Sequence, residues 1–351
     1  MLKQNIVKKV IEMNNADAFL FVSDVNRYWY TEFQSSYGFV VCTLNKTYLF
    51  LDKRYFQKAV DTIKDENIII IDLKSQQQVL DLLVELGVNK LLVEKEHFLL
   101  SDFSFYGKDI TKIIPFQSSI LRIQKTAKEL KNIQKACDIV CETMNWIQTV
   151  IEPGMTEIEV SNMVSAHMLD LGAEKNSFDP IVASGPNGAY PHHRPSNRVI
   201  ENNEFVTIDM GCIYKGYCSD LTRTFPIGTP DQKLIDAYNV VLKSNETGIQ
   251  SVKYKMNGNE LDKICRDIIS ETEFKDYFVH STGHGVGIEV HELPNVSTSY
   301  NKPLEHNSVI TVEPGIYIPG LGGIRIEDMV LVDKDNNHIT LTSLANKYRF
   351  N

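Results

Sequence analysis

The sequence predicts an α+β protein of two domains, in which a smaller α/β domain precedes a larger domain with internal pseudo-twofold symmetry. Helical and strand patterns alternate over residues 1–118. After residue 126 an order of helix, helix and hairpin occurs twice, and each hairpin carries a pair of acidic residues near opposite positions. A chain of 351 residues is long enough to fill two cores.

The first domain is expected over residues 1–118, followed by a linker at 119–125. The strands 38–44 and 47–51 are expected to form a hairpin around Asn45 and Lys46. No set of catalytic residue types gathers in this domain. Helical patterns cover 3–14, 54–64 and 76–86, and strand patterns cover 18–22, 38–44, 47–51, 68–71 and 90–93.

The second domain is expected over residues 126–351. Thr126 and Thr156 each stand three residues before a Glu and are expected to cap the first two helices. Thr229, followed by Pro and by Gln three residues on, is the expected N-cap of the third helix. We expect helices packed outside a curved sheet, with the two acidic pairs meeting at its centre.

The first acidic pair is Asp209 and Asp220. The strands around them alternate about a turn that we expect to be centred between Tyr214 and Lys215. This register places the two aspartates opposite each other, with Cβ atoms about 5 Å apart. Because like charges directly opposite destabilise a sheet, a divalent cation between them is the natural resolution.

The second acidic pair, Glu313 and Glu327, falls near opposite positions across a turn at 319–323. A single acid in a strand is usually a solvated edge residue, but two hairpins with facing pairs are improbable by accident. His284 lies in the glycine-rich segment 281–287, where the backbone can come close to a ligand. A two-metal hydrolase is therefore the leading interpretation.

Six short motifs stand out in the second domain: Asp-Met-Gly at 209–211, Ser-Asp-Leu-Thr-Arg-Thr-Phe at 219–225, Gly-His-Gly-Val-Gly at 283–287, Val-His-Glu at 290–292, Glu-Pro-Gly-Ile-Tyr at 313–317 and Gly-Ile-Arg-Ile-Glu-Asp at 323–328. These motifs resemble those of the pita-bread metallopeptidases, and most of all the Xaa-Pro peptidases, prolidase and aminopeptidase P. The resemblance is strong over about residues 125–335 and looser over the N-terminal part, which is similar to the creatinase-like N-terminal domain of that family.

The resemblance implies a site for two divalent metal ions. Asp209 would chelate one ion, Asp220 and Glu327 would bridge the two, and His284 with Glu313 would complete the other position. Four carboxylates and one imidazole suit Mn(II) best, with Co(II) or Zn(II) as alternatives.

The same resemblance assigns the catalytic residues. Two ions would activate a water, and Glu313 is the expected proton acceptor in addition to being a ligand. His192 and His291 match the two non-ligand histidines of the family, and we expect them to share stabilisation of the oxyanion and protonation of the leaving nitrogen. His193, adjacent to His192, is a rival for its role, and a surface loop is the alternative for both.

Arg325 is expected to hold a ligand carboxylate such as Glu327, or the neighbouring Asp328. A cross-strand surface pair is the alternative.

The substrate pocket is less well defined. Prolidases commonly bring a basic group to the free carboxylate of the dipeptide, some near the second histidine, but residues 291–297 contain no Lys or Arg. Arg194 or Arg198 could replace it. We expect an Xaa-Pro dipeptidase, with aminopeptidase P activity on longer Xaa-Pro peptides as the alternative. Candidate apolar walls around the proline are Phe178, Tyr190, Ile181 and Tyr214.

Other classes fit the sequence less well. A non-catalytic pita-bread binding module and a metal-free hydrolase of the creatinase type both lack the ligand set that is complete here. Methionine aminopeptidase shares the metal site but normally lacks a large N-terminal domain. The resemblance also implies a homodimer, since the N-terminal domain of the family often mediates dimerisation.

Composition excludes further partners. A net charge of −9 argues against a nucleic acid, which needs a basic face. No apolar run approaches 18 residues, and the first residues form an amphipathic pattern instead of a signal peptide, so we expect a cytoplasmic protein without a membrane span. The six cysteines lack a Cys-x-x-Cys motif and are expected to be reduced, with a disulfide between Cys212 and Cys218 as the alternative.

Overall fold

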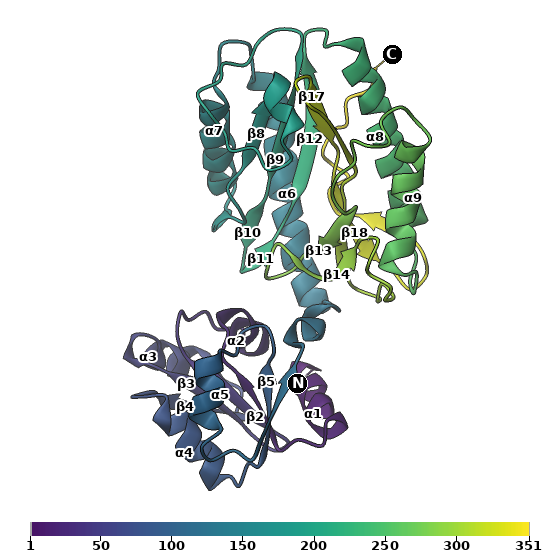
Figure 1. The fold of residues 1–351 in the computed structure, drawn as a ribbon. Helices are drawn as coiled ribbons and strands as arrows, with labels where there is room; N and C mark the ends of the chain where they lie inside the picture. Colours follow the sequence, from purple (N-terminus) through teal and green to yellow (C-terminus); the bar gives the residue numbers. More distant parts are fainter. Residues whose placement is uncertain (1, 351) are drawn as a thin grey trace. The chain divides into compact units, whose positions relative to one another are not determined.

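The computed structural model describes residues 2–350 and divides the chain into two compact units, residues 1–122 and 123–351. The first unit alternates strands and helices, and the second combines four long helices with short, mostly antiparallel strands (Figure 1). The predicted order, a smaller α/β part before a larger α+β part, is confirmed.

The first unit is built on a six-stranded mixed sheet with the order β4-β3-β2-β1-β5-β6. The β1–β2 and β2–β3 pairs are antiparallel and the other three pairs are parallel. Its elements are α1 (Leu2–Met13), β1 (Ala18–Phe21), α2 (Asp24–Thr31), β2 (Phe39–Thr43), β3 (Thr47–Leu51), α3 (Lys53–Thr62), β4 (Ile68–Asp72), α4 (Gln77–Glu85), β5 (Lys90–Glu94), α5 (Leu100–Tyr106) and β6 (Lys112–Phe116).

Successive residues of β1 point to opposite faces of the sheet and pack in different layers. Leu20 packs in one core with side chains of α4 and α5, whereas the Phe21 ring lies 5.9 Å from the ring of Tyr30 in α2. The sequence patterns predicted neither α2 nor α5, and they also missed β6. These elements are short, and β6 contains Pro115, a residue that sheets tolerate at an edge, where β6 lies.

The second unit consists of two halves with a similar order of elements. The first half contains α6 (Ala127–Val150), α7 (Glu157–Asp170), β7 (Lys175–Asn176), β8 (Ile181–Ser184), the short 3-10 helix η2 (Gly185–Ala189), β9 (Glu204–Met210), β10 (Cys212–Tyr214), β11 (Tyr217–Cys218) and β12 (Leu221–Ile227). The second contains α8 (Gln232–Ser251), α9 (Gly258–Ser270), β13 (Gly283–Gly285), β14 (Glu292–Val296), β15 (Val309–Val312), β16 (Gly315–Ile318), β17 (Gly322–Arg325), β18 (Asp328–Val332) and β19 (His338–Thr340).

Each half buries the apolar faces of two helices against strands. Val140 of α6 and Val160 of α7 share a core with Ile208 of β9. In the second half, Val241 of α8 shares a core with Ile324 of β17. Within this unit, α7 and α9 lie on opposite outer sides with the strands between them (Figure 1).

Two of the three predicted N-caps are confirmed. The hydroxyls of Thr126 and Thr156 accept hydrogen bonds from backbone N–H groups three residues later, and each belongs to a capping box. The prediction for Thr229 was wrong, because α8 begins two residues later. Asp231 is its N-cap, and its carboxylate accepts from the N–H of Lys233.

The register of the first hairpin differs from the predicted one. Asp209 pairs with Thr222, so Asp209 and Asp220 are not directly opposite. The turn is centred between Lys215 and Gly216, one residue boundary later than predicted. Both residues have positive φ, 46° and 73°, which is the requirement of the two-residue turn that matches the twist of a hairpin.

The register of the second hairpin agrees with the prediction. Val312 pairs with Asp328, and Gly315 pairs with Arg325. Glu313 and Glu327 therefore face each other in the gap between these two paired stretches.

None of the helices in residues 2–350 has both the length and the apolar composition that a membrane crossing requires. All six cysteines are unbonded and buried, so the Cys212–Cys218 disulfide is not formed.

The positive φ at the hairpin turn gives a test of its geometry. Replacing Gly216 by Ala puts a Cβ into the left-handed region, so we expect the free energy of unfolding to fall by about 1–2 kcal/mol. Lys215→Asn should be neutral or stabilising, because Asn tolerates that region. Urea unfolding of both variants measures the difference, and an unchanged midpoint for Gly216→Ala would contradict the turn assignment.

Candidate active site

A cleft of about 670 Å³ within the second unit gathers the residues that the sequence singled out. Both halves of the unit contribute to its lining. The predicted residues that line it are Asp209, Asp220, His284, Glu313, Glu327, His192, His291, Arg325, Phe178, Ile181 and Arg194.

The ligand candidates come from strands or from the ends of strands. Asp209 lies in β9 and Asp220 immediately precedes β12. His284 is the central residue of β13. Glu313 and Glu327 occupy the two breaks where the β15–β18 ladder passes into the β16–β17 ladder. The acids are therefore held by backbone that is itself hydrogen-bonded on both sides.

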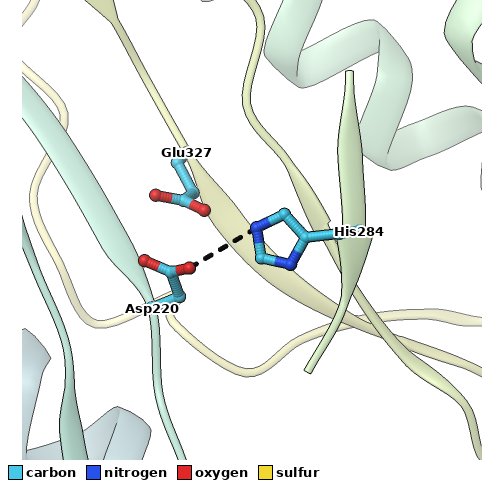
Figure 2. A group of neighbouring side chains, drawn as sticks. All are labelled: Asp220, His284 and Glu327. Carbon is cyan, nitrogen blue, oxygen red and sulfur yellow. Dashed lines mark ion pairs between the residues drawn. The ribbon is translucent and has the colours of Figure 1, made fainter. Parts of the chain in front are cut away.

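Three donor groups lie close enough to hold one ion. Ligand atoms of Asp220, His284 and Glu327 all lie within 4.8 Å of one another, and Figure 2 shows their side chains converging from three segments. His284 Nε2 is 3.6 Å from Asp220 Oδ2 and 3.2 Å from Glu313 Oε1. Glu313 is therefore next to the same group.

Burial and mutual repulsion make charge on these acids costly. Burial, reinforced by Glu327, raises the pKa of Asp220 well above its usual value, and burial with Glu313 does the same for Glu327. Burial also raises the pKa of Asp209, against the opposing effect of Arg325. Glu313 is the exception. Burial would raise its pKa, but the hydrogen bond and charge of His284 lower it to about 2.

The donor set fits divalent cations. Asp209 Oδ1 is buried and has no hydrogen-bond partner within residues 2–350. Buried polar atoms normally have one, so an unpaired carboxylate oxygen in a cleft that three further acids line indicates a place for a cation. Four carboxylates and one imidazole form an oxygen-rich set of the kind that hard divalent ions prefer.

Arg325 holds a ligand carboxylate, but not either of the predicted ones. Its Nη2 donates to Asp209 Oδ2 at 2.8 Å. Asp328 is instead bound by Arg223 at 2.7 Å and by Lys347 at 2.8 Å. The prediction that Arg325 holds a carboxylate of the ligand set therefore agrees with the structure, but the named partners were wrong, because the guanidinium reaches Asp209 on β9 instead of an acid close to it in sequence.

Arg325 is also connected, through the hydroxyl of Tyr317, to His280, a cleft residue that was not predicted from the sequence. Its Nη1 donates to the hydroxyl of Tyr317 at 2.8 Å, and that oxygen lies 2.8 Å from His280 Nε2. His280 lines the cleft, and its burial lowers its pKa. The available signal was its place four residues before His284, immediately before the glycine-rich segment 281–287.

The two predicted non-ligand histidines both line the cleft. The His291 ring lies against that of His284, with centroids 4.3 Å apart, and burial followed by the charge of His284 lowers the pKa of His291. His193 also borders the cleft, but its Nε2 lies 2.7 Å from Glu157 Oε2. Its side chain is thus engaged by a carboxylate outside the ligand set.

Two of the predicted pocket walls lie elsewhere. Among the described residues that line the cleft, Tyr190 and Tyr214 are absent. Tyr190 is 63% exposed, and Tyr214 packs against the core formed with α6 and α7. Arg198 is also unavailable as a carboxylate binder, because its guanidinium is paired with Glu204 at 2.6 Å.

Comparison with known proteins places this site in a family. The sequence model described as Metallopeptidase family M24 matches residues 131–334, more than half of the chain. The chain belongs to metallopeptidase family M24. A second model, described as Creatinase/Prolidase N-terminal domain, matches residues 5–124 of this M24 peptidase. The predicted relation to the pita-bread metallopeptidases is confirmed.

Several similar proteins match 95% or more of the M24 peptidase. A Mycoplasma genitalium protein that is provisionally named an Xaa-Pro aminopeptidase is 45% identical over 95% of either chain. An Xaa-Pro dipeptidase from Pyrococcus furiosus is 34% identical over 95% of this chain and 96% of its own. The solved structure of an Xaa-Pro dipeptidase from Bacillus anthracis has a TM-score of 0.94 and 36% identity, covering 99% of this chain and 98% of its own.

Glu157 of this M24 peptidase gives a pH test. Burial would raise its pKa, but hydrogen bonds from His193, from the N–H of Ser184 and from two further side chains lower it to about 2. A carboxyl group whose pKa is lowered by folding stabilises the fold above the unfolded pKa, and that contribution is lost as pH falls towards the folded pKa. Between an unfolded value near 4.5 and a folded value near 2, the contribution is about 3 kcal/mol at pH 7 and about 1 kcal/mol at pH 3.

We therefore expect the difference in unfolding free energy between wild type and Glu157→Gln to shrink by about 2 kcal/mol from pH 7 to pH 3. Urea unfolding of the metal-free proteins at both pH values measures it, and other carboxylates cancel in the difference. If the difference in unfolding free energy stays constant or grows from pH 7 to pH 3, the Glu157 carboxylate is not held in its charged form.

Proposed function

We propose that this chain is a metal-dependent Xaa-Pro dipeptidase that uses two divalent ions, Mn(II) in preference to Co(II) or Zn(II). The observation that carries the proposal is the convergence of four carboxylates and His284 in one buried cleft, with Asp209 Oδ1 unpaired. The names of the Pyrococcus furiosus and Bacillus anthracis relatives support the choice of substrate.

Asp209, Asp220, His284, Glu313 and Glu327 would hold the ions. When bound, the ions supply a Lewis acid that polarises the scissile carbonyl and lowers the pKa of the attacking water. The remaining steps belong to side chains of the chain itself.

Glu313 would accept the proton of the attacking water, and its position in the cleft lining beside His284 supports this role. His192 and His291 supply donors for the oxyanion and for the leaving nitrogen, and both line the same cleft. The tertiary amide before proline has no N–H, so the cleft needs no acceptor for one. Phe178 and Ile181 provide apolar surface for the ring.

The ends of the substrate can be matched to the two charges left in the cleft. Apart from the ligand set, the histidines and Arg325, the charged residues in the described lining are Asp179 and Arg194. An Xaa-Pro dipeptide is a zwitterion, so Asp179 suits its ammonium group and Arg194 its carboxylate. One acidic and one basic residue near the scissile bond favour a dipeptide as substrate. The carboxylate of a longer peptide would lie farther from that bond.

Aminopeptidase P activity is the second candidate, and the Mycoplasma genitalium relative favours it. We also propose, from the family resemblance, that the enzyme is a cytoplasmic homodimer.

The proposal predicts both activity and its loss. With Mn(II), wild type should hydrolyse an Xaa-Pro dipeptide faster than the matching Xaa-Pro tripeptide. Asp220→Asn should lower kcat/KM by about 10³-fold or more, because removing one donor disturbs the group that activates water. The two rates are measured at equal substrate concentration by release of the N-terminal residue.

Asp231→Asn is the matched control, since it makes the same chemical change at an exposed helix cap where Asn also serves. It should retain wild-type rates. A clear preference for the tripeptide would select the aminopeptidase alternative, and Xaa-Pro hydrolysis that is unaffected by Asp220→Asn would refute the metal mechanism.

A second prediction concerns Arg194. Replacing it by Gln removes the charged partner of the carboxylate, so KM for the dipeptide should rise about tenfold, which corresponds to a loss of about 1.4 kcal/mol. KM for the dipeptide amide, which has no carboxylate, should stay within about twofold of the wild-type value. Equal changes for both substrates would show that Arg194 does not bind this end.

A further inference from the structure

His192 reaches the cleft on a loop whose shape is set by one buried carboxylate. The loop joins β8 to β9, and it includes η2 and the segment Pro191-His192-His193. Glu157, the first residue of α7, lies beneath it with a side chain that is 0% exposed. Burying a charge so completely is costly unless hydrogen bonds satisfy it.

One oxygen of Glu157 holds the start of the loop. Oε1 accepts from the backbone N–H of Ser184 at 2.9 Å and from its hydroxyl at 2.8 Å. It also accepts from Asn187 Nδ2 at 3.0 Å. Three donors thus fix the segment that leads up to His192.

The other oxygen holds the loop after His192. Oε2 accepts from His193 Nε2 at 2.7 Å, and from the N–H and hydroxyl of Ser196 at 3.0 and 2.7 Å. Six hydrogen bonds from both flanks of His192 therefore end on a single carboxylate.

A second contact fixes the residue before His192. The carbonyl of Pro191 accepts from Arg325 Nη1 at 3.2 Å, and the same guanidinium binds Asp209 at 2.8 Å. The backbone on either side of His192 is thus held by two buried charged residues, Glu157 and Arg325. Arg325 also binds Asp209, a candidate metal ligand. The position of His192 is therefore set by the contacts of Pro191 and His193, the residues on either side of it.

We propose that Glu157 and His193 are positioning residues that hold the His192 imidazole at the reacting bond. The proposal rests on the proposed function for the identity of the reaction. It also gives adjacent histidines distinct roles, since the Nε2 of His193 is committed to Glu157 while His192 faces the cleft. A proton donor displaced by about 1 Å can lose about 100-fold in rate, so a buried anchor has a direct kinetic effect.

The test compares three variants of the full-length, metal-loaded enzyme. His193→Leu removes the donor to Glu157, and we expect kcat for an Xaa-Pro dipeptide to fall about 10- to 100-fold with KM within about threefold. His193→Gln offers an amide N–H in its place and should recover kcat to within about fivefold of wild type. Ser196→Ala removes one donor to the same oxygen and should cause a smaller fall in kcat. This variant keeps the test possible if His193→Leu folds poorly.

Two further measurements separate positioning from general damage. Bound metal should be unchanged in all three variants, and amide hydrogen exchange over residues 185–197 should accelerate in His193→Leu and Ser196→Ala. Glu159→Gln is the control, because this exposed acid caps the same helix through Thr156. It should leave both kcat and loop exchange at wild-type values.

The proposal is overturned if His193→Leu and Ser196→Ala keep kcat within about twofold of wild type. It is also overturned if His193→Gln is as inactive as His193→Leu, since the ring would then act chemically itself. If wild type does not cleave Xaa-Pro dipeptides, the proposed function fails, but loop exchange still tests the anchor. Unchanged exchange in His193→Leu would then refute it independently of activity.

Discussion

Repulsion among Asp209, Asp220, Glu313 and Glu327 is the constraint on which the rest of the second unit depends. Two unit charges 4 Å apart at an effective dielectric constant of 20 interact by about 4 kcal/mol, and ligand atoms of Asp220 and Glu327 lie within 4.8 Å of each other. Burial and this repulsion raise the pKa values of Asp209, Asp220 and Glu327. Glu313 differs from the other three acids, because the hydrogen bond and charge of His284 lower its pKa to about 2.

The fold meets this constraint with rigid backbone and a few buried donors. The acids stand within or beside paired strands, so they cannot move apart to relieve repulsion. Arg325 places one positive charge on Asp209, and the Thr222 hydroxyl donates to Glu327 at 2.7 Å. These groups satisfy only part of the negative charge. Divalent cations are the remaining partners that the donor set fits.

Sequence reasoning succeeded where the signal is local or chemical. The capping boxes at Thr126 and Thr156 depend on residues three apart, and both were found. The acids and His284 stood out because their chemistry is unusual in strands. The turn register failed because Tyr-Lys-Gly-Tyr permits two centres, and the positive φ of Lys215 decides between them. The placement of Tyr190 failed because its loop is shaped by Glu157, which lies 33 positions earlier in the chain.

Anomalous diffraction from crystals grown with Mn(II) tests the central claim most directly. We expect two Mn(II) peaks per chain inside the cleft, with Asp209, Asp220, His284, Glu313 and Glu327 as the protein ligands. A cleft without anomalous density at saturating Mn(II), or peaks bound only to other residues, would contradict it.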